Sequence, residues 1–301
     1  MSKKAKAFLF ALFILLPFVF LGRDLAEFRY YAPEQSLEID GIKIVYLDEG
    51  KGEAILLIHG FSGNIFNWKD VFEPLSREYR VLVPDLPGYG KSACPPRKQK
   101  HLILWYADFL ARFLDRLGIE KAVVVGNSMG GAVAGWLAVR HPEKVEKLVL
   151  VDSAGLRMPL LELMAGLVAL TPPKQMVSLV EMISPRSEKA LSRLPESEQN
   201  RALLAQARYD SELRACSSRA MRRSILSLTK DLLDGNLKQI QAPTLIIWGD
   251  NDRTLSVKNA HKFKKKIPKA ELKIIPQGGH TPMQNTPEQF LKVLKEFIEE
   301  K

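Results

Sequence analysis

Short apolar segments alternate with longer amphipathic segments along most of this chain. The apolar segments are rich in Val, Ile and Leu, and each is short enough to be a buried strand. The amphipathic segments between them carry apolar residues at helical spacing, so the pattern predicts a mostly parallel sheet with helices on both faces. The predicted parallel strands are Ala54–His59, Val81–Pro84, Ala122–Val125, Leu148–Val151, Thr244–Trp248 and Leu272–Ile275. The predicted helices include Tyr106–Leu117, Met129–Arg140 and Glu288–Glu299.

A different pattern opens the folded part of the chain. Two alternating segments, Leu37–Ile39 and Ile42–Leu47, flank Asp40-Gly41. An Asp-Gly pair between two such segments is a strong signal for a tight β-hairpin. Two antiparallel strands are therefore expected before the parallel ones, which brings the predicted sheet to eight strands.

The alternation stops over a long insertion at residues 157–242, which contains helical patterns and no convincing strand. A stretch this long is unusual as a loop, so it predicts a helical cap, or lid, inserted into a core formed by residues 31–156 and 243–301. Its first segment, Pro159–Leu170, is almost entirely apolar. It is a helix buried within the cap, a surface that lines an acyl pocket, or both, and as a pocket surface it brings Leu163 and Leu167 into contact with the substrate.

The first 30 residues have the layout of a secretory signal or a signal anchor. Lysines at positions 3, 4 and 6 precede an apolar run at Ala7–Leu21 that is interrupted only by Pro17. As a helix this run is about 23 Å long, shorter than the roughly 30 Å hydrocarbon core. Large residues at Val19–Leu21 disfavour cleavage, so an uncleaved anchor is favoured, with the catalytic domain outside the cytoplasm because of the preceding lysines. If the segment is cleaved, the protein is secreted.

Charge and cysteine content narrow the possible partners. The chain has 44 Lys and Arg against 34 Asp and Glu, a net charge of +10. A lysine cluster at Lys262–Lys269 is either a solvated helix face or a contact with anionic lipid, and it lacks the series of alternating aromatic residues that base stacking requires. Nucleic acid is therefore excluded as a binding partner. Cys94 and Cys216, the only cysteines, are too few for a Cys-based zinc site and are either free thiols or one bridge.

A serine nucleophile is predicted where a strand turns into a helix. The sequence Gly126-Asn127-Ser128-Met129-Gly130-Gly131 follows the strand that ends at Val125 and immediately precedes a helical segment. A G-x-S-x-G motif in this position forms a sharp turn that exposes the serine hydroxyl. The alternative, a serine that only caps a helix, does not require both glycines.

The serine needs a general base, and five histidines are available. His280 follows the last strand in Gly278-Gly279-His280, at the carboxyl edge where sites in parallel sheets lie, so it is the predicted base. His59 ends a strand and is expected to brace a loop. The remaining three, His101, His141 and His261, lie on or beside outer helices and are expected to be solvated or structural.

A carboxylate must orient the histidine. Asp252 lies on the loop after the penultimate strand, in Trp248-Gly249-Asp250-Asn251-Asp252, and is the predicted acid. Asp250, which is nearer the strand end, and Asp152, which follows the preceding strand, are the alternatives.

The reaction also needs two donors for an oxyanion, and backbone N–H groups commonly provide them. One is expected from Met129, directly after the nucleophile. The other is expected from Phe61 in His59-Gly60-Phe61. This chemistry requires no metal and no cofactor.

Five motifs in order make the chain similar to the α/β-hydrolases. These are His59-Gly60-Phe61, Asp85 to Ser92, Gly126 to Gly131, Gly249 to Asp252 and Gly279-His280, and they span about Leu37 to Ile298. Within that family, the apolar N-terminus and the cap resemble membrane-anchored monoacylglycerol lipases and related carboxylesterases. The chain departs from this branch at Asn285, where an acidic residue is common.

The resemblance implies a serine carboxylesterase or lipase that hydrolyses neutral carboxylic esters with short-to-medium acyl chains, or monoacylglycerol-like lipids, through an acyl-enzyme. A carbon–carbon bond hydrolase of ring-fission products is the first alternative, although those enzymes usually have Trp after the histidine, where this chain has Thr281. A non-catalytic ligand-binding homologue is the second. The serine at position 128 excludes the relatives that use an aspartate nucleophile.

Overall fold

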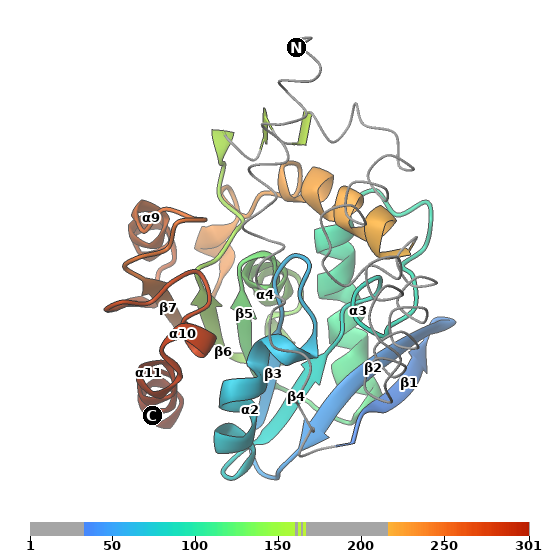
Figure 1. Ribbon diagram of the computed structural model, residues 1–301, viewed down its shortest axis with the longest axis horizontal. Helices are drawn as coiled ribbons and strands as arrows, with labels where there is room; N and C mark the ends of the chain where they lie inside the picture. The colour runs from blue at the N-terminus through green and yellow to red at the C-terminus, as the bar shows by residue number, and fades with distance from the viewer. Residues whose placement is uncertain (1–32, 160–161, 164, 167–215, 301) are drawn as a thin grey trace, which may run out of the picture.

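An eight-stranded sheet runs through the centre of the protein with helices on both faces (Figure 1). The computed structural model describes residues 33–159, 162–163, 165–166 and 216–300. The strands lie side by side in the order β1-β2-β4-β3-β5-β6-β7-β8. Their bounds are β1 Gln35–Ile39, β2 Ile42–Glu49, β3 Ala54–Ile58, β4 Arg80–Pro84, β5 Ala122–Asn127, β6 Val145–Val151, β7 Thr244–Gly249 and β8 Ala270–Ile275.

The predicted eight-stranded, mostly parallel sheet is confirmed. β1 and β2 form an antiparallel hairpin in which Ile39 is paired with Ile42, so the loop is the two residues Asp40 and Gly41, both with positive φ. This is the backbone that a tight hairpin turn requires. β2 is also antiparallel to β4, and β3 to β8 are parallel to one another. The carboxyl ends of the parallel strands consequently lie at one edge of the sheet.

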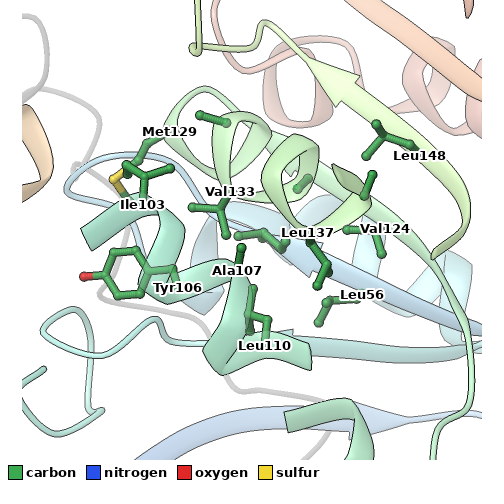
Figure 2. Close-up of a cluster of buried hydrophobic side chains, with 14 of the residues drawn as sticks. Leu56, Ile103, Tyr106, Ala107, Leu110, Val124, Met129, Val133, Leu137 and Leu148 are labelled. Carbon is green, nitrogen blue, oxygen red and sulfur yellow. The ribbon is translucent and has the colours of Figure 1, made fainter. Parts of the chain in front are cut away.

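The helices form one layer on each face of the sheet. On one face, α3 and α4 pack on side chains from β3, β5 and β6, as Figure 2 shows for Leu56, Val124 and Leu148. On the other face, α2 and α11 cover a second apolar cluster that includes Trp68 and Phe290. The helix bounds are α2 Lys69–Ser76, α3 Leu102–Arg116, α4 Met129–Arg140, α9 Lys258–Lys266, α10 Pro282–Asn285 and α11 Pro287–Glu299.

Two helices differ from the sequence expectation. α3 begins at Leu102, four residues before the predicted start at Tyr106. The extra turn forms because Leu102 and Ile103 are buried, and because the backbone N–H of Ile103 donates to the hydroxyl of Ser227 (2.9 Å). α2 was not predicted. It contains Pro74, a residue that disfavours a helix interior, but its buried residues Val71, Phe72 and Leu75 pack into the core.

Most of the predicted cap and all of the apolar N-terminal run lie outside the described residues. The C-terminal part of the cap contains a helix at residues 216–228, here named the cap helix, which crosses above the sheet edge (Figure 1). Within the described ranges, no helix is long and apolar enough to span a bilayer.

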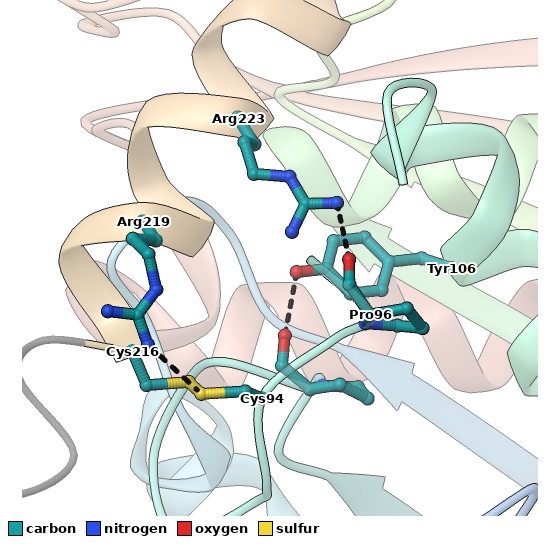
Figure 3. Close-up of a disulfide and its surroundings, with 7 residues drawn as sticks. Cys94, Pro96, Tyr106, Cys216, Arg219 and Arg223 are labelled. Carbon is teal, nitrogen blue, oxygen red and sulfur yellow. Dashed lines mark hydrogen bonds between the residues drawn. A yellow bond between two sulfur atoms is a disulfide. The ribbon is translucent and has the colours of Figure 1, made fainter. Parts of the chain in front are cut away.

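A disulfide joins the cap helix to the core (Figure 3). It links Cys216, in the first turn described for the cap helix, to Cys94, on the loop between β4 and α3. The sequence left open whether the two cysteines are free thiols or one disulfide, and in the structure they form the disulfide. Arg223 adds a second link, because its guanidinium donates to the backbone carbonyls of Pro96 and Gln99.

Candidate active site

Ser128 occupies the sharp turn between β5 and α4. Its φ is 55° and its ψ is −116°, a conformation that L-residues rarely adopt, and it immediately precedes Met129, the first residue of α4. The backbone N–H of Ser128 donates to the carbonyl of Val151 (2.9 Å), which ties the turn to β6. The residue is 9% exposed. The turn therefore holds the serine in a fixed place at the carboxyl edge of the sheet.

The two motif glycines are required because strand and helix approach closely here. A Cβ at Gly126 would lie 2.2 Å from the carbonyl oxygen of Gly130, and one at Gly130 would lie 2.3 Å from the carbonyl oxygen of Ile58. Any side chain at either position would push α4 away from the sheet. The glycines thus set the position of Ser128.

His280 and Asp252 are hydrogen-bonded on adjacent loops after β8 and β7. The Nδ1 atom of His280 lies 2.9 Å from Oδ2 of Asp252, whose side chain is fully buried. The other carboxylate oxygen, Oδ1, accepts from the backbone N–H groups of Thr254 (2.7 Å) and Leu255 (2.9 Å). Three donors thereby fix the orientation of the carboxylate. With a proton on Nδ1, the second ring nitrogen of His280 is left as a proton acceptor.

That second nitrogen, Nε2 of His280, is buried and has no hydrogen-bond partner among the described residues. A buried nitrogen without a partner is costly in a purely structural histidine, and such groups often mark a functional site. Here it is the atom that a general base needs.

Asn127 connects the turn at Ser128 to the loop that carries His280, a role that the sequence analysis missed. Its side-chain Nδ2 donates to the backbone carbonyl of His280 (3.0 Å) and to that of Val151 (3.3 Å). In the sequence, the only signal of this contact was the asparagine directly before Ser128. The sequence does not show that His280 lies beside it, because the two residues are far apart along the chain.

His59 braces the loop after β3, as expected. Its Nδ1–H donates to the carbonyl of Gly60 (2.8 Å), and its Nε2 accepts from the backbone N–H of Leu86 (3.0 Å). Complete burial lowers the pKa of His59 to about 4, so the ring is neutral at physiological pH. It therefore holds two loops together and is not a proton carrier.

The loop before Phe61 and the first residue of α4, Met129, both lie next to Ser128. A Cβ at Gly60 would lie 3.3 Å from the Cβ of Ser128, so the loop that continues into Phe61 approaches the serine closely. Met129 opens α4, where a backbone N–H has no acceptor within the helix and the helix dipole favours negative charge. The arrangement suits an anion that develops beside the serine.

The cap covers the Phe61 loop with apolar side chains. Phe61 packs against a small cluster of Ala165 and Ile225, which Leu226 extends. The hydroxyl of Tyr89 links the same region to the cap helix by donating to Ser224 Oγ (2.8 Å). Of the two predicted substrate-binding leucines, Leu163 is 55% exposed and lies outside this cluster, and Leu167 falls outside the described residues.

The alternative carboxylates differ in their surroundings. Asp250 is exposed and makes a turn contact through its backbone N–H to Ile275. Asp152 is fully buried beside Asp252, and its Oδ1 accepts from the backbone N–H of Gly249 (3.0 Å). Neither makes the bond to His280 that Asp252 makes. Asn285, the departure from the lipase branch, accepts a hydrogen bond from Thr281 Oγ1 (3.3 Å) behind the histidine loop.

Asp152, Asp252 and His280 are close enough to hold a metal ion, since one ligand atom from each lies within 4.8 Å of the others. Three of the donor atoms, both oxygens of Asp252 and Nδ1 of His280, are, however, already engaged in hydrogen bonds. Asp252 uses both oxygens for N–H donors, and His280 directs Nδ1 at Asp252. The set therefore fits a hydrogen-bonded relay better than a cation site.

Comparisons with known proteins assign the family. Residues 53–284 match the alpha/beta hydrolase fold family, and the chain belongs to that family. Lipase 1 of Psychrobacter immobilis is 30% identical over 272 residues, which cover 85% of this chain and 82% of that one. The 2-hydroxymuconate semialdehyde hydrolase of Pseudomonas sp. strain CF600 is 29% identical over 284 residues, with 89% and 97% covered. The crystal structure of a membrane phospholipase A, described as a bacterial virulence factor, superposes with a TM-score of 0.68 at 31% identity, with 98% of this chain and 94% of that chain covered.

Proposed function

We propose that this hydrolase is a serine carboxylesterase or lipase that cleaves neutral carboxylic esters with short-to-medium acyl chains, including monoacylglycerol-like lipids. The observation that carries the proposal is the pairing of Asp252 with a His280 whose Nε2 is buried without a partner among the described residues. That pairing lies at the same sheet edge as Ser128, which is held in a strained turn. The three groups are those of a serine acyl-transfer site.

The mechanism follows from the position of each group. The Oγ of Ser128 attacks the ester carbonyl carbon while Nε2 of His280 accepts its proton, and Asp252 stabilises the imidazolium that results. The backbone N–H groups of Phe61 and Met129 donate to the oxyanion. The C–O bond to the alcohol then breaks, and the alcohol leaves with the proton from His280. Water, activated by His280, hydrolyses the acyl-enzyme and restores Ser128.

The apolar contact between the cap and the Phe61 loop supports a neutral acyl group. Ala165 and Ile225 present carbon atoms to Phe61 next to the proposed oxyanion donors. An apolar wall favours an acyl chain, because each methylene that leaves water contributes up to about 0.8 kcal/mol. The similarity to a lipase and to a membrane phospholipase A agrees with this choice. Leu163 and Leu167 remain proposed contacts with the far end of the acyl chain.

Carbon–carbon hydrolysis is the alternative, and the similarity to 2-hydroxymuconate semialdehyde hydrolase favours it. A ring-fission substrate carries a carboxylate, so its site needs a cation aimed at the ligand. Arg157 is paired with Glu162, and Arg223 is committed to backbone carbonyls of the loop before α3. These two arginines are thus engaged elsewhere, which weakens the alternative.

We also propose that the N-terminal apolar segment anchors the enzyme to a membrane with its catalytic domain outside the cytoplasm. The Cys94–Cys216 disulfide supports this location, because disulfides persist mainly in oxidising compartments. A variant that begins at Tyr31 should be recovered in the soluble fraction and should keep its activity, since the sheet begins only at Gln35. Recovery of that variant with membranes would mean that another surface, such as Lys262–Lys269, binds lipid.

A substrate panel tests the reaction class. The purified full-length enzyme in detergent is given p-nitrophenyl esters from acetyl to dodecanoyl, a monoacylglycerol, a diacyl phospholipid and a dienoic ring-fission acid. The proposal predicts turnover of the neutral esters, with kcat/KM that rises with chain length until the pocket is full. Efficient cleavage of the ring-fission acid alone would favour the carbon–carbon hydrolase, and turnover confined to the phospholipid would contradict the proposed preference for neutral esters.

A further inference from the structure

A second buried carboxyl group lies beside the catalytic acid and has no role in the mechanism above. Asp152 follows β6 directly and is fully buried, with a φ of 43°. Its Oδ1 accepts from the backbone N–H of Gly249 (3.0 Å), whereas its Oδ2 is buried with no hydrogen-bond donor among the described residues. One oxygen of Asp152, one of Asp252 and one nitrogen of His280 all lie within 4.8 Å of one another.

Two carboxylates this close and this buried do not both stay ionised, because their repulsion is poorly screened. The available donors decide which one keeps the charge. Asp252 receives three N–H donors, from Thr254, Leu255 and His280, while Asp152 receives one. The negative charge therefore rests on Asp252, and a proton rests on the other carboxyl group.

The position of that proton follows from the same contacts. On Asp152, Oδ1 already accepts from Gly249, so the proton belongs on Oδ2, the atom that otherwise has no partner. An O–H there can donate to the remaining lone pair of the Asp252 carboxylate, which has room for about four donors. Burial and the neighbouring charge of Asp252 both raise the pKa of Asp152 well above its ordinary value, in agreement with this assignment.

We propose that Asp152 is a neutral carboxylic acid whose O–H donates to the Asp252 carboxylate and holds it in line with His280. Asp152 is thus a positioning residue, since it acts through Asp252. This inference rests on the proposed function for its effect on rate, but the protonation state of Asp152 does not. The donated hydrogen bond keeps Asp252 from turning away from Nδ1 of His280 when the imidazolium forms.

Two substitutions separate the hydrogen bond from the charge. In Asp152→Asn, the amide oxygen can accept from Gly249 and the amide N–H can donate to Asp252, and asparagine tolerates the positive φ. In Asp152→Gly, the donor is lost without backbone strain. We expect Asp152→Asn to keep kcat within about threefold of the wild type, and Asp152→Gly to lower kcat by roughly tenfold or more with little change in KM.

The pH profile and infrared spectroscopy complete the test. Among the described residues, the titratable groups that face Asp152 are Asp252 and His280. If Asp152 is neutral, Asp152→Asn leaves the acidic limb of the kcat/KM profile in place. If it is ionised, the substitution removes a charge beside the imidazolium and moves that limb to lower pH, which contradicts the proposal.

Infrared difference spectra need no substrate and so remain informative even if no ester is hydrolysed. At neutral pH, the wild type minus Asp152→Asn spectrum should contain the carbonyl band of a protonated carboxylic acid. Absence of this band would overturn the assignment of the proton. An unchanged kcat in a folded Asp152→Gly variant would overturn the positioning role.

Discussion

The side-chain amide of Asn127 donates to the backbone carbonyl of His280 across 3.0 Å, so the residue before Ser128 holds the loop that carries His280. The same Nδ2 also reaches the carbonyl of Val151 at the end of β6. The relative position of Ser128 and His280 therefore depends on a side chain that takes no part in the proton transfers.

Replacement of Asn127 should consequently slow the reaction without affecting binding. In Asn127→Ala the backbone carbonyl of His280 loses its hydrogen-bond donor, which costs about 1 kcal/mol. The loss also allows the imidazole ring to shift from its place, and the two effects together should lower kcat roughly tenfold. Steady-state kinetics on a p-nitrophenyl ester measures this. A matched substitution at Asn285, which bonds Thr281 behind the loop, should have a smaller effect. Equal losses at both positions would mean that the loop merely needs general support.

His59 should make the folded state sensitive to acid. Its folded pKa of about 4 lies below the ordinary value of 6.5, so the unfolded chain takes up the proton first as the pH falls. The stability contributed by the neutral ring is present above about pH 6.5 and is lost progressively toward pH 4. Between pH 7 and pH 5 this amounts to a loss of about 2 kcal/mol in the free energy of unfolding.

Urea unfolding at the two pH values checks this, with His59→Gln as the reference because glutamine does not titrate. The variant is less stable at pH 7 but should lose about 2 kcal/mol less on acidification than the wild type does. Identical pH dependence in both proteins would show that His59 is not the group responsible.

The disulfide should stabilise the attachment of the cap helix to the core. Cys94 and Cys216 are 122 residues apart, so their bond restricts the unfolded chain over a long loop. Its loss in a Cys94→Ser/Cys216→Ser double variant should cost about 2–5 kcal/mol in the free energy of unfolding. Reduction with dithiothreitol should destabilise the wild type similarly and leave the double variant unaffected. A wild type that dithiothreitol does not destabilise would contradict the expectation.

Ile225 should influence the choice of acyl chain. Ile225 packs with Phe61, beside the proposed acyl pocket. In the wild type, kcat/KM is expected to rise by up to about fourfold for each added methylene, which corresponds to about 0.8 kcal/mol. Ile225→Ala should weaken this dependence on acyl length and change the turnover of an acetyl ester little. Leu228→Ala is the matched control, since Leu228 lies one turn along the cap helix but packs into the main core. If both substitutions alter the chain-length profile equally, the effect comes from the stability of the cap helix.

Local sequence signals predicted the sheet and the positions of the main site residues. Hydrophobic runs gave all eight strands, and Gly126 and Gly130 predicted the turn at Ser128 because the required backbone geometry leaves few choices. Asp252 and His280 were placed together because the carboxyl ends of parallel strands share one edge.

Contacts between distant segments could not be read in the same way. The bond from Asn127 to His280 spans 153 residues, and the pairing of Asp152 with Asp252 depends on the depth of both side chains in the fold. The sequence could only rank Asp152 as a rival to Asp252, since spacing along the chain does not reveal which carboxylate receives more donors. Likewise, Leu163 is apolar and predicted to contact substrate, but its exposure depends on how the cap packs.

The identity of the nucleophile is the most direct test of the account. The full-length enzyme in detergent is labelled with a fluorophosphonate, digested and analysed by mass spectrometry, beside a Ser128→Ala variant whose fold is checked by thermal unfolding. If Ser128 is the nucleophile, we expect a single modified serine at position 128, loss of labelling in the variant, and a fall in kcat for neutral esters on the order of 10⁴ or more. A folded Ser128→Ala enzyme that keeps most of its ester turnover, or a label on another serine, would contradict it.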